Sequence, residues 1–300
     1  MAFLTADIIA KQALATLHES LVVKPLIHTD LTKEFSKAKV GDTINIRKPA
    51  VFESKKFNRA KGIEVQAANE ESIPVKLDQF DDVSFQVTSE ELALDIEDFD
   101  AQLLTPAMQA ISGGIDVALL GLADKVKATV GTEAGFEHNK PESLIQAGAI
   151  LDANKVPQED RYALVGPATK AHWLNTPILK QADQSGSTEA LRRASLGSNV
   201  FGFDTYMTSN IKAPAAPQAG DPSTEVGLAF HKSAFAFASA PLEVPAGAAG
   251  HVETYDGISV RVVMQYDISK KATTVSVDTL YGVSLLDPKR AVLIKGADKE

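Results

Sequence analysis

A long polar segment between two β-strand patterns constrains this sequence more than any other feature. The segment Glu53–Ser72 reads ESKKFNRAKGIEVQAANEES, and apolar residues alternate before it in TINIR and after it in SIPVKL and DVSFQV. A run of this composition has too little apolar surface to bury against its own chain. We therefore expect a long, two-stranded excursion that projects from the rest of the fold, not a compact loop.

The longest helical pattern covers Asp98 to Lys127. Its apolar residues recur every three or four positions and form one stripe, at Ile111, Ile115, Leu119, Leu122 and Val126. Pro106 lacks an amide donor, so the helix is expected to begin near Thr105. Gly113 and Gly114 each cost about 1 kcal/mol relative to alanine inside a helix. Two explanations stay open for these glycines: close packing against a neighbouring element, or a bend in the helix.

Residues 2–20 predict an amphipathic N-terminal helix, which Pro25 ends or interrupts. Asp7 and Lys11 break the apolar run that a signal peptide needs. No window of the sequence approaches the roughly 20 apolar residues of a membrane span. We therefore expect a protein without a membrane partner.

The middle and the end of the chain have different patterns. Between about 130 and 250, short helices mix with short strands such as RYALVGP and the alternating stretch in SNVFGFDTYMTSNI, whereas almost everything after Val252 is strand-like. Helices and strands are thus segregated, which favours an α+β fold over a regularly alternating one. The final strands need partners, and the strands before the long helix are the natural candidates. The middle section would then be an insertion within one domain.

No group of residues has the spacing of a catalytic, metal-binding or cofactor-binding site. None of the histidines has a second histidine, or a glutamate at metal-ligand spacing, within a helical turn; they are His18, His28, His138, His172, His231 and His251. Cysteine is absent, as are phosphate-loop and serine-hydrolase motifs. The acidic run Glu90–Asp100 is expected to be a solvated helical face. We therefore predict no catalytic residue, no metal, no cofactor and no enzyme activity.

The charge pattern favours contact with protein over an extensive contact with nucleic acid. The chain of 300 residues has a formal net charge of −9. One basic cluster lies in the polar segment, at Lys55, Lys56, Arg59 and Lys61. Four glutamates surround it, and Phe57 is the only aromatic residue nearby. This mixture suits salt-bridged contact with another protein better than a track for phosphates, so we interpret the four basic residues as contacts between subunits.

The order of these elements resembles the major capsid proteins of tailed double-stranded-DNA bacteriophages, whose fold is shared with the herpesvirus capsid floor. The resemblance covers nearly the whole chain. The stretches that carry it are GDTINIRKP, the long helix from Asp98 to Lys127, FGFDTYMTSNI, AFHKSAFAFASAPLE, and GISVRVVMQYD followed by DTLYGVSLLDPKRAVLI.

The resemblance implies an α+β fold with named parts. These are an N-terminal arm (1–42), an extended E-loop that overlaps a neighbouring subunit (43–80), a peripheral domain with a long spine helix (81–129), an inserted axial α/β domain (130–250), and C-terminal strands that complete the peripheral domain (251–300). The four basic residues would then be E-loop contacts, and Gly113 and Gly114 a point where the spine bends during shell expansion.

The function implied is self-assembly into hexamers and pentamers of an icosahedral shell around packaged double-stranded DNA. The expected partners are further copies of the chain, a portal, a separate scaffolding protein, and DNA contacted without sequence specificity; the expected locations are the host cytoplasm during assembly and then the virion. Two alternatives stay open. One is another self-associating virion component, such as a tail-tube or decoration protein, and the other is a hydrolase with a dispersed site.

Overall fold

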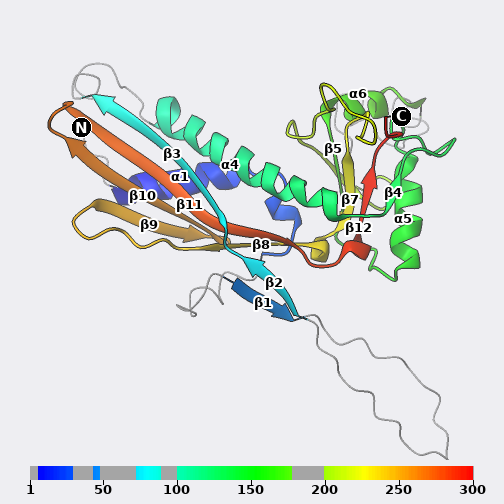
Figure 1. The fold of residues 1–300 in the computed structure, drawn as a ribbon, viewed down its shortest axis with the longest axis horizontal. Coiled ribbons are helices and arrows are strands. Elements are labelled where there is room, and N and C mark those ends of the chain that lie inside the picture. Colours follow the sequence, from blue (N-terminus) through cyan, green and yellow to red (C-terminus); the bar gives the residue numbers. More distant parts are fainter. Residues whose placement is uncertain (1–5, 30–42, 48–71, 89–99, 178–198, 300) are drawn as a thin grey trace, which may run out of the picture.

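The computed structural model describes residues 6–29, 43–47, 72–88, 100–177 and 199–299. Within these ranges the molecule has two larger sheets and one separate strand pair, and a long helix lies along the first larger sheet and leads to the second (Figure 1). The helices are α1 (Ala6–Ser20), α4 (Thr105–Leu120), α5 (Ser143–Ala153) and α6 (Pro167–Leu174), with 3-10 turns η1 (Lys24–Leu26), η3 (Gly121–Lys125), η4 (Lys232–Ala234) and η5 (Pro288–Arg290), and a π-helical turn η2 (Asp100–Leu104).

The first sheet joins strands from both ends of the chain. Its strand order is β3 (Gln79–Thr88), β11 (Ala272–Leu285), β10 (Ile258–Asp267) and β9 (Ala249–Tyr255), and β8 (Phe235–Ala240) pairs with the end of β11. All these pairings are antiparallel. β3 lies along β11 over its whole length, from Gln79 opposite Tyr281 to Thr88 opposite Ala272. This confirms that the final strands pair with a strand that precedes the long helix.

Two helices cover one face of the first sheet. α1 contacts β9, β10 and α4, and α4 contacts β3 and β11. The helices bury their apolar stripes against alternate residues of the strands, which are the ones that point to that face. The helix side of this core includes Leu14, Leu17, Met108, Ile111 and Ile115, and the strand side includes Val260, Val262, Val275 and Val277. Burial of a large aliphatic side chain contributes about 1.5–3 kcal/mol, so this interface fixes α1 and α4 on the sheet.

The second sheet is mixed and has its own core. Its order is β4 (Thr129–Val130), β12 (Ala291–Ile294), β7 (Gly227–His231), β5 (Arg161–Val165) and β6 (Asp204–Met207). The pairs β4–β12 and β5–β6 are parallel, and the other two are antiparallel. Its core includes Leu144, Leu151, Trp173, Phe203 and Val292. The alternating stretch FGFDTYMTSNI therefore supplies an edge strand, β6.

The two sheets divide the chain differently from the expected ranges 130–250 and 251–300. β8, expected with the axial domain, lies in the first sheet, and β12, expected with the peripheral strands, lies between β4 and β7 in the second. The chain crosses from one sheet to the other at η4 and again at η5. Alternation of apolar residues identifies a strand, but it does not show which sheet the strand joins.

The long helix begins where the proline predicted. α4 starts at Thr105 with Pro106 in its first turn, directly after the π-helical turn η2, and continues unbroken through Gly113 and Gly114. The expectation that no window approaches a membrane span was wrong for one segment: the helical run Gln102–Lys125 is long and apolar enough to cross a membrane by length and composition alone. Its apolar stripe, however, packs against α1, β3 and β11, as expected of a core helix.

Candidate functional site

A separate pair of strands forms the base of the predicted excursion. β1 (Thr43–Arg47) and β2 (Ser72–Lys76) pair antiparallel, from Thr43 opposite Lys76 to Arg47 opposite Ser72. The pair forms its own two-stranded sheet, below the first sheet in Figure 1. Arg47 and Ser72, the residues on either side of segment 48–71, therefore lie opposite each other at one end of this hairpin. The predicted contact residues Lys55, Lys56, Arg59 and Lys61 belong to that segment and lie outside the described residues.

The base of the hairpin is fastened to the first sheet at two points. Val75 of β2 is fully buried against Ala236 and Ala238 of β8. At Gly282 of β11, an added Cβ would lie 2.8 Å from the carbonyl carbon of Lys76. Only a glycine therefore allows β2 to cross β11 at backbone contact distance. The hairpin is thus attached firmly at its base.

A buried lysine fastens the N-terminal helix to the sheet. Lys24, in the turn after α1, has a fully buried side chain, and its Nζ donates to Asp256 Oδ2 at 2.5 Å and to the Asp256 carbonyl oxygen. Asp256 lies in the β9–β10 turn with a φ of +46°. The hydrogen bond from Lys24 lowers the pKa of Asp256, so this carboxylate is held ionised. His18 Nε2 lies 3.3 Å from the same carboxylate.

A buried aspartate holds the same turn from the other side. Asp116 of α4 is 2% exposed and accepts hydrogen bonds from the amides of Val23, at 3.1 Å, and Val22, at 3.3 Å. Burial raises the pKa of Asp116 from 3.8 to about 6, although both amide bonds oppose the shift. The long helix therefore supplies the acceptor for amides that follow the end of α1.

The two glycines of the long helix have different surroundings. Tyr281 donates to Asp81 Oδ2 at 2.8 Å, and an added Cβ at Gly114 would lie 2.7 Å from that same oxygen. Burial, together with the Asp81 carboxylate, raises the pKa of Tyr281, which stays a donor. An added Cβ at Gly113 would meet nothing within 4 Å. Close packing therefore explains Gly114 but not Gly113.

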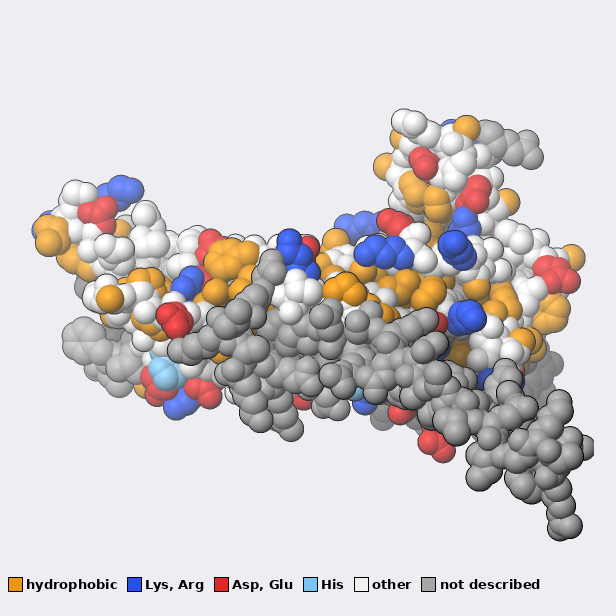
Figure 2. Space-filling model, turned by 60° about the horizontal axis from the view of Figure 1, so that its bottom comes forward, with side chains coloured by type: hydrophobic (Ala, Val, Ile, Leu, Met, Phe, Trp, Pro, Cys, Tyr) orange, Lys and Arg blue, Asp and Glu red, His pale blue; other side chains and the backbone are white. Residues whose placement is uncertain are grey.

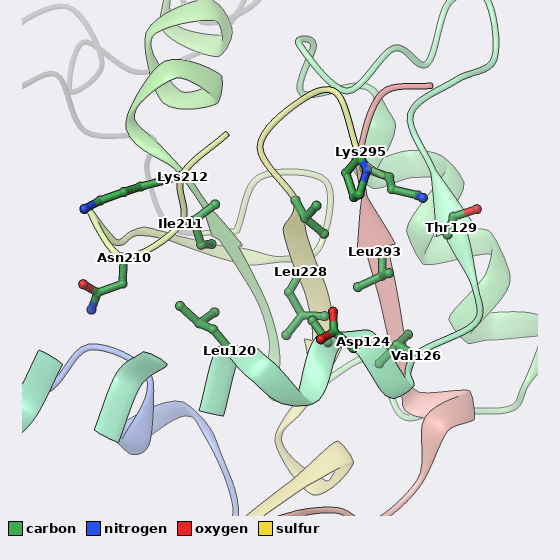
Figure 3. Close-up of a pocket in the computed structure, with 13 residues that line it drawn as sticks. Leu120, Asp124, Val126, Thr129, Asn210, Ile211, Lys212, Leu228, Leu293 and Lys295 are labelled. Atoms are coloured by element: carbon green, nitrogen blue, oxygen red, sulfur yellow. The ribbon is translucent and has the colours of Figure 1, made fainter. Parts of the chain in front are cut away.

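A pocket of about 400 Å³ lies where the end of the long helical run meets the second sheet (Figure 3). Its apolar lining includes Leu120, Ile211, Leu228 and Leu293. The two lysines at its rim, Lys212 and Lys295, point away from each other in Figure 3, and Lys295 pairs with Asp298 at 2.5 Å. These charged groups do not converge on a common point, so the pocket has no arrangement that suggests catalysis.

One contact between a serine and a histidine bears on the hydrolase alternative. His231 Nδ1 lies 2.7 Å from Ser233 Oγ and accepts the Ser233 amide at 3.1 Å, while Arg290 donates to the serine hydroxyl at 2.5 Å. Burial, and then Arg290, lower the pKa of His231. The histidine thus caps the short helix η4, which is a structural use of such a pair. Neither side chain lines the pocket in Figure 3.

The structure also brings together three residues that the sequence did not connect with one another. Asp7 of α1 meets His251 and Glu253 of β9, with the three ligand atoms within 4.8 Å of one another. The signal in the sequence was the pair His251 and Glu253, two residues apart on one face of a strand. Two residues apart on a strand, these side chains do not have the helical spacing of the familiar metal-binding motifs.

The surface mixes residue types around the second sheet. On the face shown in Figure 2, Lys and Arg side chains gather toward that end of the molecule, with acidic and hydrophobic side chains among them.

Comparison with known proteins identifies the fold. No protein-family description matches the sequence, and no curated protein matches it. A structure from Mycobacterium phage Che8 matches with a TM-score of 0.67 at 18% identity, covering 91% of this chain and 90% of that chain. The capsid structure of the cyanophage P-SCSP1u matches with a TM-score of 0.56 at 14% identity, covering 93% and 89%.

A third similar structure is not from a phage. The holo-SrpI encapsulin complex from Synechococcus elongatus PCC 7942 matches with a TM-score of 0.51 at 14% identity, covering 86% of this chain and 82% of that chain. These similarities show the fold: the chain has the tailed-phage capsid fold that the order of its elements predicted.

Proposed function

We propose that this protein is the major capsid protein of a tailed bacteriophage and that it assembles into the hexamers and pentamers of an icosahedral shell. One observation carries the proposal: a chain with the tailed-phage capsid fold has a hairpin, β1–β2, that stands apart from its two larger sheets. Its base is anchored by Val75 and Gly282, yet its two strands join neither of the larger sheets. Such a hairpin gains its burial from a neighbouring subunit.

The parts of the fold receive their roles within this proposal. The hairpin and segment 48–71 act as the E-loop, α1 belongs to the N-terminal arm, α4 is the spine of the peripheral domain, and the second sheet forms the axial domain. A portal, a separate scaffolding protein and the packaged DNA are the further partners, with assembly in the host cytoplasm. In this role the chain needs no enzyme activity and no cofactor.

Electron microscopy of the purified chain in negative stain tests the proposal. We expect capsomers or closed shells. Tubes would support a tail-tube protein instead, and a monomer that stays single at high concentration would overturn self-assembly and favour the hydrolase alternative.

Charge reversal in the E-loop tests its contact role. The triple variant Lys55→Glu, Lys56→Glu and Lys61→Glu should impair assembly, because it replaces ammonium groups that pair with carboxylates of a neighbouring subunit. The variant with arginine at the same three positions keeps the positive charge and should assemble. Circular dichroism should be unchanged in both. Normal assembly of the glutamate variant would contradict the role of these lysines.

A protein shell without a genome is the second candidate, favoured by the similarity to an encapsulin. Nucleic-acid content separates the two. Particles isolated from their natural source should contain nuclease-protected double-stranded DNA if the shell is a phage capsid, and none if it encloses something else.

A further inference from the structure

Three potential metal ligands converge where the N-terminal helix meets the first sheet. His251 Nε2 lies 3.2 Å from Asp7 Oδ1 and 3.2 Å from Glu253 Oε2. All three side chains are between one third and one half exposed.

The fold fixes this arrangement from two elements. His251 and Glu253 lie opposite Val262 and Val260 of β10, so they share the face of the sheet that carries α1. α1 packs on β9 and β10 through its buried stripe, and Asp7 lies in its first turn. The cluster is therefore held by the packing of a helix on a sheet and does not depend on the conformation of a loop.

Hydrogen bonding alone accounts poorly for this geometry. A single ring nitrogen carries at most one N–H, yet two carboxylate oxygens lie equally close to it. The carboxylate oxygens of Asp7 and Glu253 lie within 4.8 Å of each other and repel, and Lys11 offsets only part of the charge on Asp7. A divalent cation bound to the ring nitrogen and to both carboxylates resolves both problems. Zinc–ligand distances of about 2.0–2.2 Å with tetrahedral angles separate ligand atoms by about 3.4 Å, close to the 3.2 Å between His251 Nε2 and each of the two carboxylate oxygens.

We propose that Asp7, His251 and Glu253 form a binding site for a divalent transition-metal ion of the zinc class. One imidazole with two carboxylates suits such ions better than Ca²⁺ or Mg²⁺, which prefer oxygen ligands alone. Glu253 also lines an open groove of about 360 Å³ between α1 and β9, which leaves room for water to complete the coordination. The bound ion clamps α1 to the edge strand β9. This proposal does not depend on the shell function.

Lys11 regulates the strength of this site. Its Nζ lies 3.1 Å from Asp7 Oδ1, the same oxygen that faces His251. The ammonium group and the metal ion therefore compete for one carboxylate. Removal of this ammonium group should strengthen metal binding, whereas removal of any ligand should weaken it.

Zinc binding to the chelator-treated, full-length protein tests the proposal. By equilibrium dialysis, the wild type should bind Zn²⁺ with an affinity that falls at least tenfold in His251→Ala and in Glu253→Gln. His18→Ala is the matched control, because His18 lies nearby on α1 but pairs with Asp256, and it should bind like the wild type. Zn²⁺ should also raise the melting temperature of the wild type and of His18→Ala, but not of the two ligand variants.

Two further variants keep the test decisive if a ligand variant folds poorly. Asp7→Asn conserves shape at a side chain that is 45% exposed and should weaken Zn²⁺ binding at least tenfold with unchanged circular dichroism. Lys11→Ala should tighten binding several-fold. Equal Zn²⁺ affinity in the wild type, His251→Ala and Asp7→Asn would overturn the proposal, and so would weaker binding in Lys11→Ala.

Discussion

Several buried ionisable residues each hold a piece of backbone in place. Lys24 binds the β9–β10 turn, Asp116 binds the amides after α1, and Glu225 binds the start of α6. Glu225 is 6% exposed and accepts from the amides of Ala168 and Thr169 at 3.1 and 2.8 Å. A buried charge is tolerated only with such partners. These residues are thus explained by structure, without reactive chemistry.

Asp116→Asn should remove a pH dependence of stability. The pKa of Asp116 is raised to about 6 in the folded chain, so the folded chain holds this proton more tightly than the unfolded chain. The contribution of Asp116 to the free energy of unfolding is therefore most favourable at low pH and is lost as the pH rises from about 4 through 6. Between pH 4.5 and 7.5 the wild type should lose about 2 kcal/mol more unfolding free energy than the variant.

Urea unfolding of both proteins at the two pH values measures this difference. The comparison isolates Asp116, because every other titrating group is common to the two chains. Parallel pH profiles would show that the carboxyl titrates alike in the folded and unfolded states.

The sequence could not have identified these contacts. Lys24 and Asp256, or Asp116 and Val23, are distant in the chain and have no shared pattern. The same holds for Asp7 and His251. Only the packing of α1 against α4 and β9 brings such residues together. What the sequence did show at this scale was the exclusion of familiar catalytic motifs.

At the scale of elements, the long helix offers a matched pair of substitutions. Gly113→Ala should stabilise the isolated chain by about 0.5–1 kcal/mol, because alanine restricts the unfolded chain and meets no neighbour. Gly114→Ala should be less stable than Gly113→Ala by about 1–2 kcal/mol, because its Cβ displaces Asp81 from Tyr281. Thermal and urea unfolding would measure both, and equal stability of the two variants would contradict this account.

The bend proposed for Gly113 and Gly114 concerns the same helix in an assembled shell. In the isolated chain α4 continues unbroken through both residues. The double alanine variant should hinder shell expansion if the spine bends there. Normal expansion with a straight helix throughout would rule out the bend.

The base of the hairpin depends on one glycine. Gly282→Ala places a methyl group against the backbone of Lys76, which cannot move aside as a side chain could. We expect a loss of about 1–3 kcal/mol and a loosened β2, without loss of the pairing between β3 and β11. Hydrogen exchange should be faster at the amides of Ser72–Lys76 and unchanged in β10. Unchanged exchange in β2 would contradict the role of Gly282.

Elements were the level at which sequence patterns were most informative. Alternation located β1, β2 and β3 on either side of the polar segment, and Pro106 located the start of α4. The patterns did not reveal the π-helical turn η2, which has the composition of an ordinary helix. The role of Gly282 was also hidden, because close approach of another strand leaves no trace in the local pattern.

At the scale of the whole molecule, the α+β class followed from the segregation of helices and strands. The pairing of the final strands with β3 followed from their need for partners. The sequence did not show which sheet β8 and β12 join, because both are short apolar strands that either sheet could accommodate. The capsid fold was recognisable from the order of elements. How the last strands divide between the two sheets depends on the points η4 and η5, where the chain passes from one sheet to the other.

Both larger sheets require the last strands of the chain. β11 is the central partner of β3, β10 and β8, and β12 joins β4 to β7. A ribosome must therefore release almost the entire polypeptide before either core can close. A polypeptide that stops before β11 therefore lacks a strand that each sheet needs, and neither sheet can form completely.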